Sequence, residues 1–485
     1  MTELDSGTTS RSDIRSSTRE PGLWDPALIA VAFGTFVIVS SPGLVAIALP
    51  SLSRSLALSI RQAGWVQVAF QIGILSILLV AGQITERVGV RITYAAGCAL
   101  FAVASFGGAV VRTVALLIGI RVVQGLGAAL TIANNRAILA SEISASVRGR
   151  AMGVMQAASG FGSALAIVAG GALIAAVGWQ GAFWLMGALG VVAAVIAHGC
   201  LSSPPVVRPE PPDRLSTVLS FITFGSFAVG LAGLALGDWR GLLERSTLLC
   251  GGAALVAFVL RERYAVRPLA PWRAVAAPVV VGGNMGAVCI QAARAGVLFL
   301  VPFQLERVHG FSVGTAALLL VALPVAETLL APLSGWVYDR VGPRLPTTVG
   351  AIVAAAGMVL MARLAPDAAR WWIVCVMVVA GVGLGLFHSA NNGAVMSGVS
   401  TRFSIVASSF LATSITLGLL LGAAAGSGIV AVRRAHYLAD GDSARVAFNL
   451  ALRDGFSAMA ALAAVAAVAS LLRGRHGSDD AALDS

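Results

Sequence analysis

The chain has 485 residues, of which 58% are hydrophobic and only 11% are charged, and its 33 basic against 22 acidic residues give a formal net charge of +11. So apolar a composition excludes a soluble protein with one core and predicts an all-α integral membrane protein that crosses the bilayer many times. A basic excess is also typical of nucleic-acid-binding proteins. Here the arginines stand between apolar runs and form no dense stripe, so we interpret them as loop charges that orient helices and expect no nucleic-acid partner.

The N-terminal segment 1–25, rich in Ser, Thr and Arg, is predicted to be a disordered cytoplasmic tail. The apolar run that follows it is longer than the core of a signal peptide, so it is expected to remain in the membrane as the first helix. A helix needs about 20 apolar residues to cross roughly 30 Å of hydrocarbon. Fourteen such runs follow one another, at 27–50, 64–84, 93–111, 114–138, 151–176, 181–201, 216–236, 246–261, 278–303, 313–337, 346–363, 371–396, 404–432 and 454–472.

An even number of spans places both termini on one side of the bilayer, and a moderate excess of arginines on that side predicts that it is the cytoplasm of the cell membrane. Two pairs of similar segments then explain the count. They lie nearly the same distance apart in the sequence, which indicates two parallel six-helix units with an extra helical pair between them. The predicted domains are a six-helix bundle, a Pro-rich linker, two inserted helices, a second six-helix bundle and a cytoplasmic tail, at 26–201, 202–215, 216–263, 264–472 and 473–485.

The clearer of these pairs is a repeated decapeptide at 82–91 and 335–344. Each copy ends an apolar run with charge, which predicts a helix that leaves the membrane into a short cytoplasmic hairpin. The glycines are expected to permit close backbone approach and a tight turn. In the alignment of the two copies, Gly82, Glu86, Arg87, Gly89 and Arg91 correspond to Gly335, Asp339, Arg340, Gly342 and Arg344. The second pair of segments is 133–137 and 390–394, which share an Ala-Asn-Asn-x-Ala pattern.

Glycines also predict where helices pack. Small residues at every fourth position let two backbones approach closely in a membrane, where apolar side chains gain little by leaving lipid. The span at 404–432 carries Gly418, Gly422 and Gly426, and its counterpart at 151–176 carries the pair Gly170 and Gly171. We expect both faces to line the interface between the two halves.

Ionisable groups inside a membrane are costly and are candidates for function. Among the acids, only Glu327 falls near the centre of a predicted span. Burial disfavours its charged form and a nearby cation favours it, a balance that a proton carrier needs. The alternative is a paired or permanently protonated Glu that only holds helices together.

Two arginines, Arg121 and Arg294, are predicted to be comparably buried. Arginine stays charged, so each must meet a carboxylate, carbonyl groups, water or an anionic ligand. Because Arg294 and Glu327 lie on consecutive antiparallel spans, we predict that they pair.

His388 is the other titratable residue placed well inside a span, either as a hydrogen-bonded structural residue or as a proton relay. Together with four amide side chains it is expected to line a substrate cavity, and the sequence does not decide which of them face it. These amides are Gln71, Gln124, Asn284 and Gln291.

Enzyme and nucleotide-binding patterns such as HExxH, GxSxG and the P-loop do not occur in the sequence, and neither does a metal-ligand spacing. We therefore expect no enzymatic activity, no cofactor and no metal. Energy for transport is then expected to come from an ion gradient or from the substrate's own gradient.

With these residues in view, the chain resembles the major facilitator superfamily, and specifically its fourteen-helix drug:proton antiporter branch. The decapeptides are similar to the superfamily's loop 2–3 signature and its second-half echo. This resemblance implies a cytoplasmic gate in which the acid and arginines stabilise one side of an alternating-access cycle. The stretch 121–127, Arg-Val-Val-Gln-Gly-Leu-Gly, is similar to the fourth-helix motif, and implies that Arg121 takes part in proton coupling.

Three positions depart from the branch. Glu86 stands where the signature usually has Asp, and Ser41 stands where a membrane Asp is usual in the first helix. The fifth helix keeps a Gly pair at 170–171 but lacks the expected preceding Gly-Pro. These departures leave Glu327 as the mid-span carboxylate available to a mechanism.

The expected function is a monomeric secondary exporter of amphipathic small molecules, such as drugs or antibiotics, that exchanges them for protons across the lipid bilayer. One alternative is a facilitator or importer of an anionic metabolite, with Arg121 and Arg294 binding its charge. A second alternative is a membrane receptor or scaffold that has kept the fold and lost transport.

Overall fold

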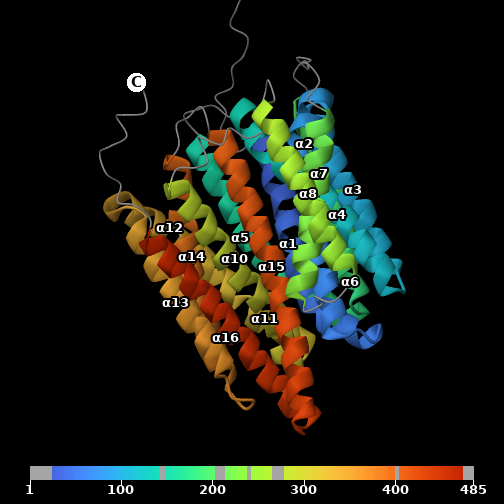
Figure 1. Ribbon diagram of the computed structural model, residues 1–485, viewed down its shortest axis with the longest axis vertical. Coiled ribbons are helices and arrows are strands. Elements are labelled where there is room, and N and C mark those ends of the chain that lie inside the picture. Colours follow the sequence, from blue (N-terminus) through green and yellow to red (C-terminus); the bar gives the residue numbers. More distant parts are fainter. Residues whose placement is uncertain are drawn as a thin grey trace, which may run out of the picture.

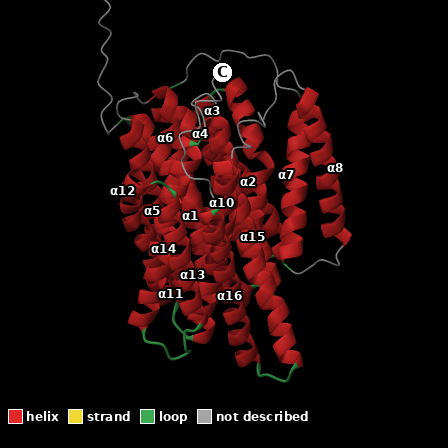
Figure 2. Cartoon of the chain, turned by 60° about the vertical axis from the view of Figure 1, so that its left-hand side comes forward, coloured by secondary structure: helices red, strands yellow, loops and turns green. Residues whose placement is uncertain are grey.

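The computed structural model describes residues 25–142, 148–202, 214–236, 242–264, 278–398 and 404–472. The tails predicted at 1–25 and 473–485 lie, apart from Asp25, outside the described residues, as does most of the linker predicted at 202–215. Within the described ranges every regular element is a helix (Figure 2). The fold is therefore the all-α membrane architecture that the composition predicts.

The helices are numbered by their order along the chain (Figure 1). Their bounds are α1 (Pro26–Ser55), α2 (Ile60–Val88), α3 (Val90–Val110), α4 (Val114–Glu142), α5 (Arg148–Val177), α6 (Gln180–Cys200), α7 (Arg214–Ala235), α8 (Leu242–Tyr264), α10 (Pro278–Phe303), the π-helix η1 (Gln304–Val308), α11 (Val313–Leu320), α12 (Ala322–Val341), α13 (Arg344–Ala362), α14 (Arg370–Ser397), α15 (Ser404–Ala439) and α16 (Ala444–Leu471).

Twelve helical segments in the described part of the chain are long and apolar enough to cross a membrane. The prediction of a multi-pass membrane protein is thus confirmed. Helices α2 and α8 are not among the twelve, although they have 29 and 23 residues. The apolar stretch of α8 is short, Arg245–Ala257. The count of fourteen spans stays a prediction.

The span expected at 313–337 is present as Val313–Val341, and its helix is interrupted at Val321 between α11 and α12. Pro324 follows, and a proline has no N–H to give to the carbonyl of Leu320 and clashes with it. The spans expected at 404–432 and 454–472 extend further toward each other than predicted, because α15 runs on to Ala439 and α16 begins at Ala444.

Polar contacts between α15 and α16 stabilise the parts of these helices that extend beyond their apolar runs. Arg433 on α15 forms an ion pair with Asp454 on α16. The hydroxyl of Tyr437 donates to the same carboxylate at 2.9 Å and accepts from Arg433 at 2.8 Å. These bonds neutralise the arginine that a hydropathy count places at the end of the span.

The helices form two bundles, which we call the first bundle (α1 to α6) and the second bundle (α10 to α16). Within the first, α2 packs on α4, α3 on α4 and α6, and α1 on α5. Within the second, α10 packs on α15, α13 on α14 and α16, and α12 on α14. The bundles meet where α2 contacts α15 and where α5 contacts α11 and α12. Helix α7 lies against α2 and α15, with α8 packed on its outer side (Figures 1 and 2).

The glycine stripe of α15 faces a different partner from the one expected. A Cβ at Gly418 or Gly422 would collide with the backbone carbonyl of Val288 or Ala292 on α10, which belongs to the same bundle. The expectation that this stripe lines the interface between halves is therefore wrong. The residues Ser427 and Gly428, directly after the stripe, reach α2 and α7 instead.

The glycine pair of α5 divides its contacts between the two bundles. Gly170 faces Leu44 on α1, whereas Gly171 faces Ala317 on α11. Gly160, three turns earlier, faces Thr328 on α12. Helix α5 thus contributes to the contact between bundles, as expected, because small residues leave room for the opposite helix.

The two decapeptides form equivalent turns. Gly89 ends α2 with φ of 93° and Gly342 ends α12 with φ of 77°, a left-handed conformation that glycine adopts without strain. The helices run along one long axis, and an even number of helical passes separates the turns, from α3 to the α11 and α12 pair. Both turns therefore lie at the same end of the molecule, which we call the hairpin end.

The contact between α2 and α4 yields a prediction about folding. A Cβ at Gly125 would collide with the carbonyl oxygen of Phe70 and lie 2.8 Å from the α-carbon of Gly73, whereas Gly119 on the same helix has open space. We expect Gly125→Leu to lower the free energy of unfolding by about 2 kcal/mol or more, because backbone atoms cannot yield. Gly119→Leu is the matched control. Equal midpoints of thermal unfolding in detergent for the two variants would contradict this account.

Candidate functional site

A charged trio lies inside the second bundle. Glu327 on α12 accepts a hydrogen bond from Nε of Arg294 on α10, at 3.0 Å to Oε2. Its other oxygen, Oε1, lies 2.8 Å from Nδ1 of His388 on α14. The side chains are 18%, 18% and 19% exposed. The structure thus places Arg294 beside Glu327, and adds His388, which the sequence did not connect with them.

Two glycines on α14 explain how His388 reaches the carboxylate. A Cβ at Gly385 would collide with the carbonyl oxygen of Glu327, and one at Gly381 would collide with that of Leu323. The backbones of α12 and α14 therefore touch at Glu327, and His388 follows Gly385 by about one helical turn on the same face. The spacing Gly381-x-x-x-Gly385 is visible in the sequence, and it is the signal by which this contact could have been found.

The hydrogen bonds of the trio define its charge. Arginine keeps its proton, so Arg294 and Glu327 form an ion pair. A neutral His388 whose Nδ1–H donates to Oε1 leaves the trio with no net charge. Its second nitrogen, Nε2, is buried and has no hydrogen-bond partner among the described residues.

Arg121 lies in a second polar centre, inside the first bundle. Its side chain is fully buried. Its NH1 donates to Oε1 of Gln124 at 2.7 Å and to the hydroxyl of Ser41 at 3.1 Å, and its Nε donates to the carbonyl of Val66 at 3.3 Å. The guanidinium also stacks 4.5 Å from the ring centroid of Phe70.

Among these described contacts of Arg121 there is no carboxylate. Ser41, the residue that replaces the expected membrane Asp, occupies the place where a counter-charge would lie. Gln124 is itself held, since its Nε2 donates to Ser105 at 2.6 Å. The structure therefore does not bring Arg121 to Arg294 and Glu327, and Gln124 is bound to Arg121 and Ser105. The residues that sequence and resemblance point to for proton coupling therefore lie in two centres, one in each bundle.

The remaining amides keep unpaired oxygens. Gln71 on α2 and Gln291 on α10 are buried, and Asn284 on α10 is half-buried with its Nδ2 bonded to the carbonyl of Val280. In the described structure the side-chain oxygens of all three are buried without a hydrogen-bond partner. Such acceptors are costly to leave unpaired, so each suits a ligand or water that donates a hydrogen bond.

At the hairpin end most of the charged residues of the decapeptides are exposed. Arg87, Asp339, Arg340 and Arg344 belong to this group. Arg340 stacks on the ring of Trp336 at 3.8 Å. Arg91 is half-buried, and the side chain of Glu86 lies outside the described residues.

The glycines within the two repeats do not all act as expected. A Cβ at Gly82 would meet no atom of a neighbouring described helix within 4 Å, and one at Gly335 would meet only the hydroxyl of Ser389, at 3.7 Å. The expectation of close backbone approach is therefore wrong for Gly82 in this conformation. The tight-turn role belongs to the later glycines, Gly89 and Gly342.

The opposite end of the molecule is closed between the bundles. NH2 of Arg54, at the end of α1, lies 3.0 Å from Oε2 of Glu306 in η1, and the Glu306 side chain is 3% exposed. Gly64 on α2 packs against Ser427 on α15 at this end. Sequence reasoning missed the Arg54–Glu306 pair, because both residues fall at span ends where charge is ordinary.

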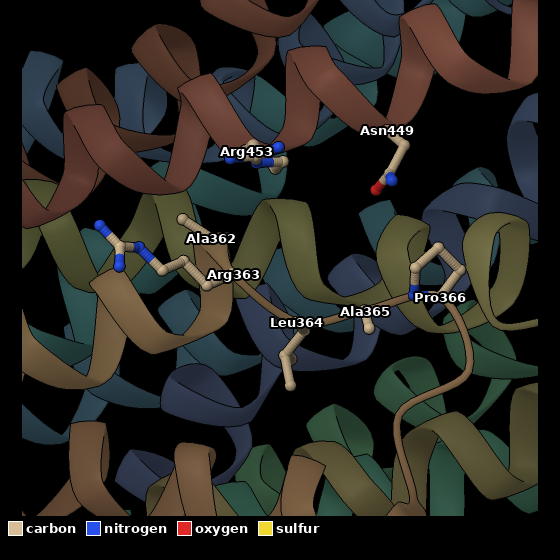
Figure 3. A pocket seen from close by; sticks show the side chains of 7 residues that line it. All are labelled: Ala362, Arg363, Leu364, Ala365, Pro366, Asn449 and Arg453. Carbon is tan, nitrogen blue, oxygen red and sulfur yellow. The ribbon is translucent and has the colours of Figure 1, made fainter.

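Two hollows also lie at the closed end, away from the trio. One, of about 420 Å³, is bounded by the α13–α14 turn and by Asn449 and Arg453 on α16 (Figure 3). The other, of about 320 Å³, adjoins Arg54 and Glu306. Neither contains Glu327, so neither coincides with the candidate site.

Comparison with known proteins agrees with this architecture. The chain is 28% identical over 400 residues to the tetracenomycin C resistance and export protein of Streptomyces glaucescens, covering 82% of this chain and 74% of that protein. It is 26% identical over 405 residues to the riboflavin transporter RibZ of Clostridioides difficile, covering 82% and 86%. The methylenomycin A resistance protein of Streptomyces coelicolor is 26% identical over 433 residues, covering 88% and 90%.

A solved structure shows the same fold. A bacterial homologue of the human lysosomal transporter Spinster, inward-facing and unoccupied, superposes with a TM-score of 0.67 at 16% identity, covering 92% of this chain and 96% of that chain. The family model of the Major Facilitator Superfamily matches residues 31–423. That match includes the first decapeptide, Arg121 and the whole charged trio, and the chain therefore belongs to the Major Facilitator Superfamily of membrane transporters.

Proposed function

We propose that the protein is a secondary active exporter of amphipathic small molecules, driven by proton antiport through alternating access. The observation that carries this proposal is the trio of Arg294, Glu327 and His388. A carboxylate held between a fixed cation and an imidazole in the membrane interior is expensive to maintain unless it has a function. A change of protonation there alters the charge of the second bundle at its centre.

Coupling requires that proton affinity differ between the two states of the cycle. Glu327 and His388 lie on α12 and α14, and α12 also touches α5 of the first bundle through Thr328 and Gly160. A movement of one bundle against the other therefore displaces Thr328, which follows Glu327 in α12. The proposed proton-coupling residue and a contact between the bundles are thus neighbouring residues of one helix.

The substrate is expected to bind between the bundles near the midplane. The unpaired amide oxygens of Gln71, Asn284 and Gln291 offer hydrogen-bond acceptors among mostly apolar side chains. That combination suits an amphipathic molecule with a few polar donors. The names of relatives that confer resistance to tetracenomycin C and methylenomycin A support an antibiotic or drug as substrate.

The closed end and the hairpin end supply the two gates of this cycle. Opening the closed end requires separation of Arg54 from Glu306. We infer that the decapeptide residues, including Glu86, Arg87, Asp339 and Arg340, form the cytoplasmic gate that closes at that stage. Both termini would then be cytoplasmic in the cell membrane, and the transporter would work as a monomer.

Helices α7 and α8 fit an additional pair of spans. Each bundle has six membrane passes if α11 and α12 count as one, and α7 joins α2 of the first bundle to α15 of the second. The proposal is therefore a fourteen-span protein of the drug:proton antiporter branch. The predicted boundaries of its domains at 26–201, 216–263 and 264–472 are part of this proposal.

One observation favours a second function, the transport of an anionic metabolite. Arg121 is fully buried and no carboxylate is among its described contacts, so a negatively charged substrate that reaches it when the bundles move apart would neutralise it. An anion gradient, and not a pH gradient, would then drive transport.

The proposed role of Glu327 can be tested by transport. In proteoliposomes, Glu327→Gln is expected to abolish substrate-dependent proton movement, because the amide cannot keep the ion pair with Arg294. Asp367→Asn, an acid-to-amide change in the exposed α13–α14 turn, is the control and should behave like the wild type. Wild-type proton exchange in Glu327→Gln would remove this residue from the mechanism. Transport that survives collapse of the pH gradient and follows an anion gradient would favour the second function.

A further prediction concerns the gate. Arg87→Ala and Arg340→Ala should each slow turnover about tenfold, equivalent to about 1.4 kcal/mol on the barrier, while substrate binding changes less. The reason is that both residues lie at the hairpin end, away from the trio. Turnover in proteoliposomes and binding by titration give the two quantities. Arg112→Ala, at the opposite end, is the control, and an equal loss of binding in the gate variants would place these arginines in the substrate site.

A further inference from the structure

We propose that the transported proton is carried on Nε2 of His388, with Glu327 and Arg294 as the positioning residues that hold the imidazole ready to accept it. This inference rests on the proposed antiport and names the atom at which the proton binds.

Both oxygens of Glu327 are already engaged. Oε2 accepts from Arg294 at 3.0 Å and Oε1 lies 2.8 Å from Nδ1 of His388. A proton placed on either oxygen would weaken one of these bonds, and a hydrogen bond between arginine and a carboxylate is among the stronger kinds. The carboxylate is therefore a poor place to add a proton while the trio is assembled.

Nε2 of His388, in contrast to the oxygens of Glu327, is free to accept a proton. With the hydrogen on Nδ1, directed at Glu327, Nε2 carries the free lone pair of the neutral ring. It is buried and has no partner among the described residues. A proton that binds there forms one N–H bond and breaks no hydrogen bond of the trio. Release of that proton to water on the other side restores the neutral ring, so the cycle is balanced.

The charges around His388 are few. Helix α14 packs against α10, α11, α12, α13 and α15. Within the described parts of these helices, Arg294 and Glu327 are the charged groups near the imidazole. The other charged side chains lie toward the helix ends, from Asp339 and Arg344 at the hairpin end to Arg370 and Arg433 at the closed end. The trio therefore has no net charge with a neutral ring and a charge of +1 with a protonated one.

This change of charge suits exchange. Imidazole is the side chain whose unperturbed protonation changes between pH 5 and 8. A neutral trio accepts an amphipathic substrate nearby at low electrostatic cost. A protonated trio carries an uncompensated charge, which raises the cost of placing an apolar molecule beside it and excluding water. Substrate and proton would then bind alternately, as antiport requires.

The test begins with the proton site itself and needs no substrate. Full-length protein with isotope-labelled histidine, in lipid nanodiscs, is titrated from pH 5 to 8 by nuclear magnetic resonance. The imidazole signal that disappears in His388→Gln is expected to show Nε2 gaining a hydrogen on acidification while Nδ1 keeps its own, and Glu327→Gln is expected to change the Nδ1 signal. A His388 signal that does not change over this range would overturn the proposal.

Transport supplies the second arm, with tetracenomycin C as the probe in proteoliposomes. His388→Gln should lose probe-dependent proton release by at least tenfold while probe–probe exchange persists, because glutamine can still donate to Glu327 but cannot take up a proton. His198→Gln, an exposed histidine of α6, is the control. Wild-type proton release in His388→Gln would refute the assignment. Absence of release in the wild type would instead count against proton antiport of this probe, and the titration would still decide the proton site.

Discussion

A carboxylate in the interior of a membrane bundle must be compensated locally, because neither lipid nor distant charge can stabilise it. Glu327 meets this constraint with a cation on one oxygen and an imidazole on the other. Three helices of the second bundle are thereby tied together at one point. A change of protonation at this centre therefore changes the contacts between α10, α12 and α14 together. This is the physical basis for coupling in the proposed mechanism.

That centre depends on backbone contact. Gly381 and Gly385 remove the side chains that would separate α14 from α12, and similar contacts join α2 to α4 and α10 to α15. Close helix pairs of this kind move as units, so relative motion is expected between the bundles, not within them. The contacts between bundles are fewer and include the Arg54–Glu306 pair at the closed end. The Arg54–Glu306 pair therefore lies between the two bundles, whereas the trio lies between helices of one bundle.

The first bundle contains a positive charge of a different kind. Arg121 donates to a hydroxyl, an amide and a carbonyl and lies over an aromatic ring, its NH2 has no hydrogen-bond partner among the described residues, and no acid is among its described contacts. A buried cation that relies on dipoles alone is less stable than one in an ion pair. The two bundles, which share the same decapeptide and the same Ala-Asn-Asn pattern, thus differ at their polar centres, and the proposed proton chemistry belongs to the second.

Sequence alone determined the membrane class, most of the helices, the paired turns at Gly89 and Gly342, and the isolation of Glu327 within a span, because hydropathy and turn chemistry are local properties. It also suggested Arg294 as a neighbour of Glu327 through consecutive antiparallel spans. Only the tertiary structure decided that His388 completes the trio, that Arg121 lies apart from it, and that the glycines of α15 face α10. A helix that is apolar on every side carries no signal for which face meets which neighbour. That choice is made by packing against other helices, which the order of residues does not reveal.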